Sequence, residues 1–365
     1  MSILIFIISL ALLILVHEFG HFIVAKKSGI RVDEFGLGFP PKIWTKKWGE
    51  TNYTLNAIPF GGFVKIFGED THSGNISEFD KSRSFQYKPK WIQALVLVAG
   101  VTMNIIFAWL LLSLGFMIGI ASPMDSRFGD VTDVHVVITE VLPDSPAKKA
   151  GLRAGDAILS LVTDNSVLKD NTLTSDSARD FIEKSDGKNI GVVYTRGNSV
   201  HQTAIVEPNG NIVPGKLAIG VGMENVGLLK LSVPSAFVRG AQTTYLLTKA
   251  TVVGITTFIW NVVTLKADFS QVSGPVGIAG VVGEAEALGF VYLLSFVALI
   301  SINLAVINLL PFPALDGGRL LFVFIEAIIR RPISSKFVRW TNTIGFVILL
   351  VLMLIVTGHD ILKLL

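Results

Sequence analysis

The stretch that decides the fold reads SILIFIISLALLILVHEFGHFIVA, residues 2–25. It is apolar from Ser2 to Val16 and then carries two histidines and a glutamate. A helix over Met1 to Ala25 is long enough to cross a hydrocarbon layer of about 30 Å. The run lacks a basic leader and no small-residue cleavage site follows it, so we interpret it as a retained membrane span rather than a signal peptide.

Composition also indicates a membrane protein. The 365 residues are 51% hydrophobic, with a mean hydropathy of +0.60, which is too apolar for an ordinary soluble enzyme. The absence of cysteine excludes disulfides, thiolate metal ligands and a cysteine nucleophile. The net charge of +3 is small and the basic residues are dispersed, so we expect a lipid bilayer around the chain and no nucleic-acid partner.

The expected fold is an α-helical polytopic membrane protein with four spans, a membrane-associated β-hairpin and one inserted α+β domain. Residues 1–121 form the first membrane half, with spans at about 1–25 and 91–121. Between them, two short strands around a Pro-Gly turn predict a hairpin at about 53–66. The second membrane half, residues 288–365, contains spans at about 288–329, broken at 311–318, and at 338–356.

The inserted domain covers residues 122–225, where charges, glycine and proline return. Its short β-type runs lie at 134–141, 157–162, 189–195 and 202–206, with one helical stretch at 175–184. A connector of residues 226–287 follows. We expect residues 228–266 of it to be helical and able to lie at the membrane interface, and residues 273–283, which are Gly-rich, to form a loop.

Loop charges predict the orientation of the spans. Residues 26–90 carry eleven basic and seven acidic residues, and the loop between spans three and four carries Arg330, Arg331, Lys336 and Arg339 with no acid among them. The positive-inside rule therefore places both loops in the cytoplasm. The segment 122–287, with fourteen basic and seventeen acidic residues, should lie outside together with both termini.

The histidines of the first span form an HExxH motif, His17-Glu18-Phe19-Gly20-His21. Histidines at positions i and i+4 share one helical face, so both imidazoles can reach one ion, and Glu18 can take a proton from water on the metal. Ionisable residues inside a span are costly and need a function or a partner. The alternative is that His17 and His21 are solvated at the interface, which leaves Glu18 unexplained.

A catalytic zinc needs a third protein ligand, and Asp316 is the outstanding candidate. It lies in NLLPFPALDGG, residues 308–318, where two prolines break a membrane helix and two glycines allow a tight turn. Irregular backbone at membrane depth is tolerated where it lines a polar cavity. The alternative on this segment alone is that Asp316 caps the following helix, but the HExxH motif in the same bilayer favours the ligand.

Other polar residues carry weaker signals. Asn308 could hydrogen-bond a substrate backbone or a developing oxyanion, or it could join two helices. The same alternatives apply to Asn104, where we favour the interhelical bond. The remaining histidines lack metal-ligand spacing and are expected at the surface: His72, His135, His201 and His359.

Together these residues resemble the site-2 protease family, and within it the bacterial regulator-of-sigma-E type. The resemblance covers nearly the whole chain. It rests on HExxH at 17–21, the Asn-x-x-Pro-x-Pro-x-Leu-Asp-Gly-Gly segment at 308–318, Gly-Gly-Phe-Val-Lys at 61–65 and Ser-Gly-Pro-Val-Gly at 273–277.

The resemblance implies one zinc ion per chain held by His17, His21 and Asp316, with Glu18 as the general base, in a multi-pass protein of the bacterial inner membrane. It implies that the hairpin near Gly61, Gly62 and Phe63 presents substrate as an extended strand. It further implies that Asn308 and Pro311 take part in substrate handling.

The inserted domain also resembles a known module. Residues 141–156 read VLPDSPAKKAGLRAGD, which is similar to the signature of a PDZ domain, a module that adds a peptide strand to a sheet edge. The best-known regulator-of-sigma-E enzymes carry two such domains in tandem, whereas this chain shows one. We therefore expect a peptide or protein ligand for a single PDZ-like domain.

The resulting hypothesis is a zinc-dependent endopeptidase that cuts a single-span membrane protein within its transmembrane segment. A membrane-anchored anti-sigma factor or a remnant signal peptide is the substrate that the resemblance suggests. One alternative is a catalytically inactive membrane scaffold that tethers partners through the PDZ-like domain. Another is a metalloprotease that cuts loops at the membrane surface.

Overall fold

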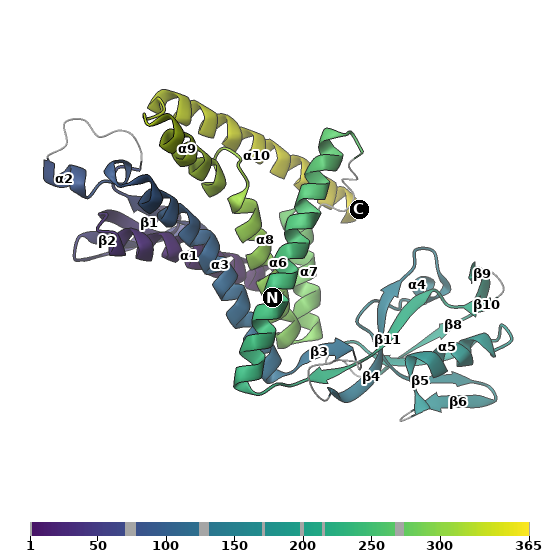
Figure 1. Cartoon of the computed structure of the whole chain (residues 1–365). Coiled ribbons are helices and arrows are strands. Elements are labelled where there is room, and N and C mark those ends of the chain that lie inside the picture. The colour runs from purple at the N-terminus through teal and green to yellow at the C-terminus, as the bar shows by residue number, and fades with distance from the viewer. Residues whose placement is uncertain are drawn as a thin grey trace. The chain divides into compact units, whose positions relative to one another are not determined.

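The computed structural model describes residues 2–69, 78–123, 131–169, 172–197, 201–213, 216–266 and 274–364. The chain forms two compact units (Figure 1). The helical unit comprises Met1–Leu112, Gly240–Gly283 and Ser295–Leu365, and the sheet unit comprises Ser113–Arg239 and Glu284–Leu294.

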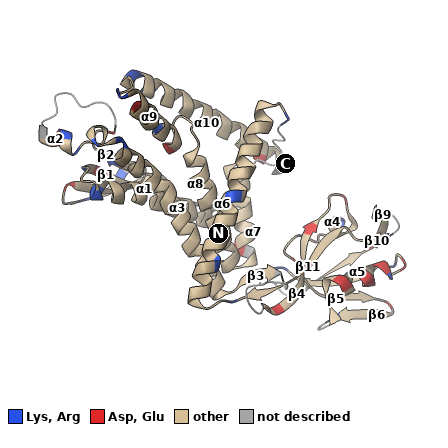
Figure 2. Ribbon diagram, in the orientation of Figure 1, with Lys and Arg blue, Asp and Glu red and all other residues tan. Residues whose placement is uncertain are grey.

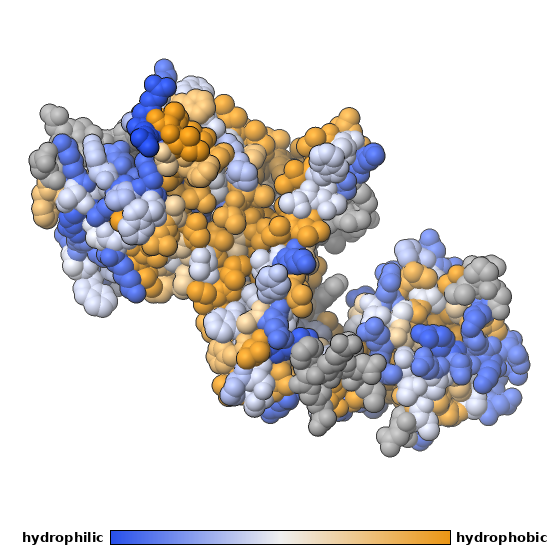
Figure 3. All heavy atoms as spheres, in the orientation of Figure 1, coloured by the Kyte–Doolittle hydropathy of each residue, from blue (hydrophilic) through white to orange (hydrophobic). Residues whose placement is uncertain are grey.

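Five helices in the described residues are long and apolar enough to cross a membrane. They are α1 (Ser2–Lys27), α3 (Lys90–Ile118), α6 (Val233–Val263), α8 (Phe290–Leu309) and α10 (Ser335–Leu364). The expected multi-pass helical membrane protein is therefore confirmed, but the number of four spans is not, because α6 also qualifies by length and composition. Figure 3 shows apolar side chains over the surface of the helices α8 to α10.

The shorter helices are α2 (Glu78–Ser82), the 3-10 helix η1 (Phe85–Tyr87), α4 (Pro146–Lys149), α5 (Ser175–Glu183), α7 (Pro275–Leu288) and α9 (Asp316–Ile329). Helix α7 corrects the expected loop at 273–283, of which Ser273 lies outside the described residues. In an apolar setting a helix satisfies its own backbone groups, which outweighs the low helix propensity of glycine. The carboxylate of Asp360 in α10 also accepts a hydrogen bond from the amide of Gly277 at 2.8 Å.

The third predicted span is broken as expected, but over residues 310–315 rather than 311–318. Helix α8 ends at Leu309 and α9 begins at Asp316, so Gly317 and Gly318 are helical rather than part of the turn. These glycines serve close packing. A Cβ on Gly317 would lie 2.2 Å from the carbonyl oxygen of Leu310, and one on Gly318 would lie 2.2 Å from that of Phe312.

The two strands predicted at 53–66 do not pair with each other as a hairpin, because both belong to β2 (Thr51–Ile66), which pairs with β1 (Val32–Trp48). Residues 32–37 of β1 pair with 52–55 on one side and with 62–66 on the other. The chain crosses between these positions at Gly61, whose φ of +106° suits glycine. Among the described residues, 62–66 has no strand partner on its other side, so it forms one edge of the sheet.

The sheet unit contains the remaining strands: β3 (Ile120–Pro123), β4 (Val131–Val141), β5 (Ala157–Thr163), β6 (Ser166–Lys169), β7 (Ile190–Thr195), β8 (Gln202–Val206), β9 (Asn209–Val213), β10 (Lys216–Ala218) and β11 (Val221–Leu229). The main sheet has the order β3-β11-β4-β5-β7-β8, with β6 paired to β5. The four strands and the helix expected in this region are all present. Their apolar side chains bury one core that includes Ile138, Leu161 and Ile190.

Charged residues are unevenly distributed among the elements. Figure 2 shows helix α8 without charge, while acidic residues gather on α5 of the sheet unit and basic residues on the connection between α9 and α10. This distribution fits helices in contact with lipid and a sheet unit in contact with water.

Candidate metal centre

Helix α1 presents the HExxH motif toward α3 at a point where the two helices approach closely. A Cβ on Gly20 would lie 2.4 Å from the carbonyl oxygen of Ala99. A Cβ on Gly100 would lie 2.4 Å from Nε2 of His21 and 2.8 Å from that of His17. Gly20 therefore allows the two helices to approach, and Gly100 leaves the space that both imidazoles occupy.

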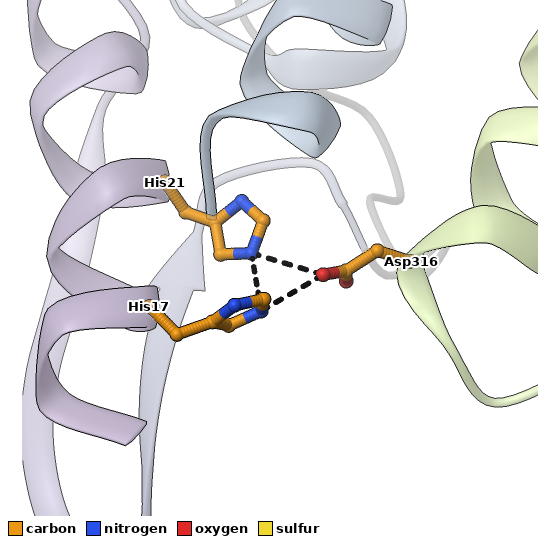
Figure 4. A group of neighbouring side chains, drawn as sticks. All are labelled: His17, His21 and Asp316. Carbon is orange, nitrogen blue, oxygen red and sulfur yellow. Dashed lines mark hydrogen bonds and ion pairs between the residues drawn. The ribbon is translucent and has the colours of Figure 1, made fainter. Parts of the chain in front are cut away.

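Asp316, at the start of α9, points into the same space (Figure 4). Its Oδ2 lies 2.9 Å from Nε2 of His17 and 3.3 Å from Nε2 of His21, and the two Nε2 atoms are 3.2 Å apart. These three ligand-type atoms form a compact group, the three-residue centre, from helices separated by 299 residues in sequence.

The distances fit a zinc ion. Ligand atoms about 2.0–2.1 Å from a tetrahedral ion lie roughly 3.3 Å from one another, which is close to the three separations above. Two imidazoles and one carboxylate form a donor set that catalytic zinc uses, and it leaves a fourth position open. Both histidines are buried, and the Asp316 side chain is 21% exposed, so the group is enclosed but accessible from one side.

Each histidine is held by a second contact through its other ring nitrogen. Nδ1 of His21 donates to the backbone carbonyl of Val96 at 2.8 Å. Nδ1 of His17 lies 3.2 Å from the side-chain amide of Asn104. Both rings therefore direct Nε2 toward Asp316, the orientation that a metal ligand requires.

Glu18, half-buried on α1, lies next to the edge segment of the hairpin sheet. A Cβ on Gly62 would be 3.5 Å from Cγ of Glu18 and 3.3 Å from the side chain of Ile14. The small residue at position 62 thus allows an extended backbone to pass beside this carboxylate.

The other predicted substrate residues are not part of the three-residue centre. Gly61 and Phe63 flank Gly62 in β2, and Phe63 packs against Gly36 of β1. Asn308 is half-buried near the end of α8. Pro311 is exposed and lines a largely apolar cavity of about 560 Å³.

Two residues near the centre were missed by sequence reasoning or given a weaker role. Gly100 carried no signal on its own, and Asn104 was interpreted as an interhelical group. Their i, i+4 spacing places them on one face of α3, which could have suggested a joint role once α3 was paired with α1.

The remaining histidines follow the sequence expectation in part. His135 is exposed and pairs with Asp133 at 3.0 Å, and His201 is exposed. His359 is half-buried rather than at the surface, because it lies beside Asp360 where α10 packs near Gly274. His72 lies outside the described residues.

Comparison with known proteins gives one consistent result. The sequence model of peptidase family M50 matches residues 5–352. A putative zinc metalloprotease of Clostridium perfringens is 37% identical over 355 residues, covering 97% of each chain. Another, from Nostoc sp., is 36% identical over 360 residues, covering 96% of this chain and 93% of the relative. The regulator of sigma-W protease RasP of Bacillus subtilis is 30% identical over an alignment of 443 residues that covers 98% of each chain.

Proposed function

The chain belongs to peptidase family M50, and from this premise we propose that it cuts a peptide bond inside the transmembrane segment of a membrane-anchored substrate. It is a multi-pass membrane protein and a zinc metalloprotease. The observation that carries the proposal is the three-residue centre, since His17 and His21 lie within a membrane-length apolar helix. A protease whose metal ligands lie at that depth acts on substrates that enter the bilayer.

In this proposal His17, His21 and Asp316 hold one zinc ion. When bound, zinc acts as a Lewis acid that lowers the pKa of a bound water and polarises a carbonyl. The carboxylate of Asp316 offsets part of the charge of the ion in an enclosed site. The contact of Nδ1 of His21 with the carbonyl of Val96 keeps that imidazole oriented before the ion arrives.

Glu18 is the proposed general base. It accepts a proton from the attacking water and passes it to the nitrogen of the leaving amine, so the same carboxylate is available for the next turnover. Its position next to the three-residue centre in sequence and beside Gly62 in space supports this role.

The edge segment 62–66 is the proposed docking strand for substrate. A helical substrate hides its amides in internal hydrogen bonds, so it must unwind before cleavage. An unpaired sheet edge offers backbone groups to an extended peptide. The closeness of Gly62 to Glu18 supports presentation of the scissile bond at this edge. Asn308, near the end of α8, and Pro311, in the break before α9, would also contact the substrate.

The sheet unit is proposed to be a PDZ-like domain that binds a peptide or protein ligand. The sequence signature at 141–156 supports this, and its last residue has a clear structural role. Asp156 is fully buried and accepts two hydrogen bonds from the guanidinium of Arg196, at 2.7 and 2.8 Å. The proposed placement is outside the bacterial plasma membrane, with a cytoplasmic hairpin.

The name of one relative suggests a substrate class. One relative is named regulator of sigma-W protease, which supports a membrane-anchored anti-sigma factor as substrate for this chain as well. A remnant signal peptide is the other single-span substrate that we propose to test.

The test is cleavage of a model single-span substrate in liposomes by the wild-type protein and by Glu18→Gln. We expect the wild type to cut inside the span, and the variant to retain stoichiometric zinc but lose cleavage, as mapped by mass spectrometry and metal analysis. A cut outside the span would contradict intramembrane cleavage. Loss of zinc together with activity in Glu18→Gln would contradict the general-base role.

A further inference from the structure

Asn104 of α3 is a buried amide beside the three-residue centre, and the hydrolysis proposed above does not use it. Its side chain is fully buried, and its Nδ2 lies 3.2 Å from Nδ1 of His17. The hydroxyl of Ser301 in α8 donates to the backbone carbonyl of Asn104 at 2.8 Å. The residue is therefore fixed between α1 and α8.

The chemistry of imidazole decides which amide atom must face His17. A neutral imidazole has one N–H and one lone pair, so a histidine that offers Nε2 to a metal carries its hydrogen on Nδ1. His21 meets this requirement, because its Nδ1 faces the carbonyl of Val96, which can only accept. For His17 the corresponding acceptor is the side-chain oxygen of Asn104.

That oxygen is available. Oδ1 of Asn104 is buried and has no hydrogen-bond partner within the described ranges. A half turn of the amide about its last side-chain bond exchanges the oxygen and the nitrogen. The carbonyl oxygen then accepts from Nδ1 of His17 at the observed separation.

We propose that Asn104 is a positioning residue that fixes His17 in the tautomer with Nε2 open to zinc. The inference rests on the proposed ligand role of His17. Asn104 contacts neither the substrate nor the metal in this proposal and acts only through the histidine. Gly100, one helical turn earlier, leaves room for the ring that Asn104 orients.

Two substitutions separate this role from simple helix packing. Asn104→Leu keeps the approximate volume but removes the acceptor, whereas Asn104→Asp keeps an acceptor oxygen. Asn303→Leu is the matched control, because Asn303 is also an amide on an apolar helix and accepts from the hydroxyl of Thr251 at 3.1 Å. The Asn303→Leu substitution removes this interhelical hydrogen bond without changing the contacts of His17.

The measurement is the zinc dissociation constant of the full-length protein in detergent, by competition with a chelating dye. We expect Asn104→Leu to weaken zinc binding about 10–100-fold, as loss of an outer-shell partner typically does. Asn104→Asp should stay within about threefold of the wild type, or bind more tightly, because a carboxylate is a stronger acceptor. Asn303→Leu should leave the constant unchanged.

Thermal unfolding in excess chelator reports on helix packing independently of zinc. Equal zinc affinity in Asn104→Leu and the wild type would overturn the inference, as would equal losses in Asn104→Leu and Asn104→Asp. Asp316→Ala distinguishes this failure from that of the proposed function. If Asp316→Ala loses zinc but Asn104→Leu does not, only the role of Asn104 is wrong.

Discussion

Asp316 has two candidate roles, metal ligand and helix cap, and its position in α9 separates them. The N-cap of α9 is Leu315, so Asp316 is already the first helical residue, and no side chain caps this helix. Its carboxylate instead faces His17 and His21. This geometry favours the ligand role that the sequence left open.

The corresponding prediction concerns Asp316→Ala. We expect zinc affinity to fall by more than the roughly 10–100-fold that outer-shell changes produce, because a direct ligand is lost. Stability of the metal-free protein should change little, since no cap is removed. A capping residue would show the opposite pattern, with zinc retained and about 1 kcal/mol of stability lost. Metal analysis and thermal unfolding in chelator measure both quantities.

Gly100→Ala tests the space between α1 and α3. Alanine is the better helix former by about 1 kcal/mol, but its Cβ would lie 2.4 Å from Nε2 of His21. We expect roughly tenfold or greater loss of zinc affinity, with the helix content measured by circular dichroism unchanged. Gly115→Ala in the same helix is the control, because its nearest contacts would be at 3.8 and 3.9 Å. Equal zinc binding in both variants would contradict the steric argument.

At the scale of elements, one ion-pair network joins α1 to the hairpin turn. Glu50 lies in the turn between β1 and β2, and its carboxylate accepts hydrogen bonds from Lys26 at 2.8 Å and from Arg83 at 2.5 Å. The hydrogen bond from Lys26, followed by that from Arg83, lowers the pKa of Glu50 below its usual 4.5. The ionised carboxylate therefore stabilises the folded state.

The contribution of Glu50 to the stability of the folded state should decrease in acid. Because the folded-state pKa is depressed, the contribution of Glu50 is present above about pH 4.5 and is lost as the pH falls through the lower folded-state value. We expect Glu50→Gln to be less stable than the wild type by about 1 kcal/mol or less at pH 7, since the pairs are partly solvated. This difference should disappear in acid.

Thermal unfolding of the wild type and Glu50→Gln between pH 3 and pH 7, about the range over which carboxylates titrate, measures this difference. Glu140→Gln is the control, because Glu140 is exposed and has no ion pair among the described residues. A difference that grows on acidification would contradict the sign of the argument.

Some elements could be predicted from sequence because their signals are local. The HExxH pair needs only the helical period, and the break before Asp316 needs only two prolines. Helix α7 and strand β1 were not predicted, because local sequence patterns do not indicate them. The amide of Gly277 in α7 donates to Asp360, which lies 83 residues further along the chain. Strand β1 contains Pro40 and Pro41, which are atypical of strands, so the sequence does not indicate a long irregular strand there.

The surroundings of the three-residue centre could be predicted only in part, for the same reason: they depend on contacts between distant segments. Its three ligands could be predicted because histidine and aspartate side chains within a membrane span indicate a metal site. Gly100 and Asn104 could not, since their roles exist only where α3 packs against α1, and no local pattern specifies that packing.

At the scale of the whole molecule, the contacts on either side of α6 indicate whether this helix crosses the membrane. Lys90 at the start of α3 pairs with Glu326 near the end of α9 at 2.6 Å. The starts of α3 and α10 therefore lie on one side, and if both helices cross the membrane we expect their far ends on the other. Leu231, just before α6, donates to the carbonyl of Phe116 near the far end of α3. Gly277, after α6, bonds Asp360 near the far end of α10.

Helix α6 is thus expected to begin and to be followed by segments on the same side, which favours a helix that does not cross the bilayer. Only the residues between Lys266 and Gly274 could return the chain from the opposite side. They reach at most about 28 Å when extended, and lipid-exposed extended backbone is excluded from the hydrocarbon region. A crossing α6 would also place Arg330 and Arg331 outside, against the positive-inside rule.

The prediction is four spans, with the ends of α6 and the sheet unit outside. Because the chain has no cysteine, single cysteines report topology without background. In intact cells, an impermeant maleimide should label Ser166→Cys and Leu265→Cys, whereas Lys336→Cys should react only after permeabilisation; all three positions are exposed. If α6 crosses, Leu265→Cys becomes protected and Lys336→Cys reactive, while Ser166→Cys stays labelled. The two topologies therefore predict opposite results at two positions and the same result at the third, which serves as the internal control.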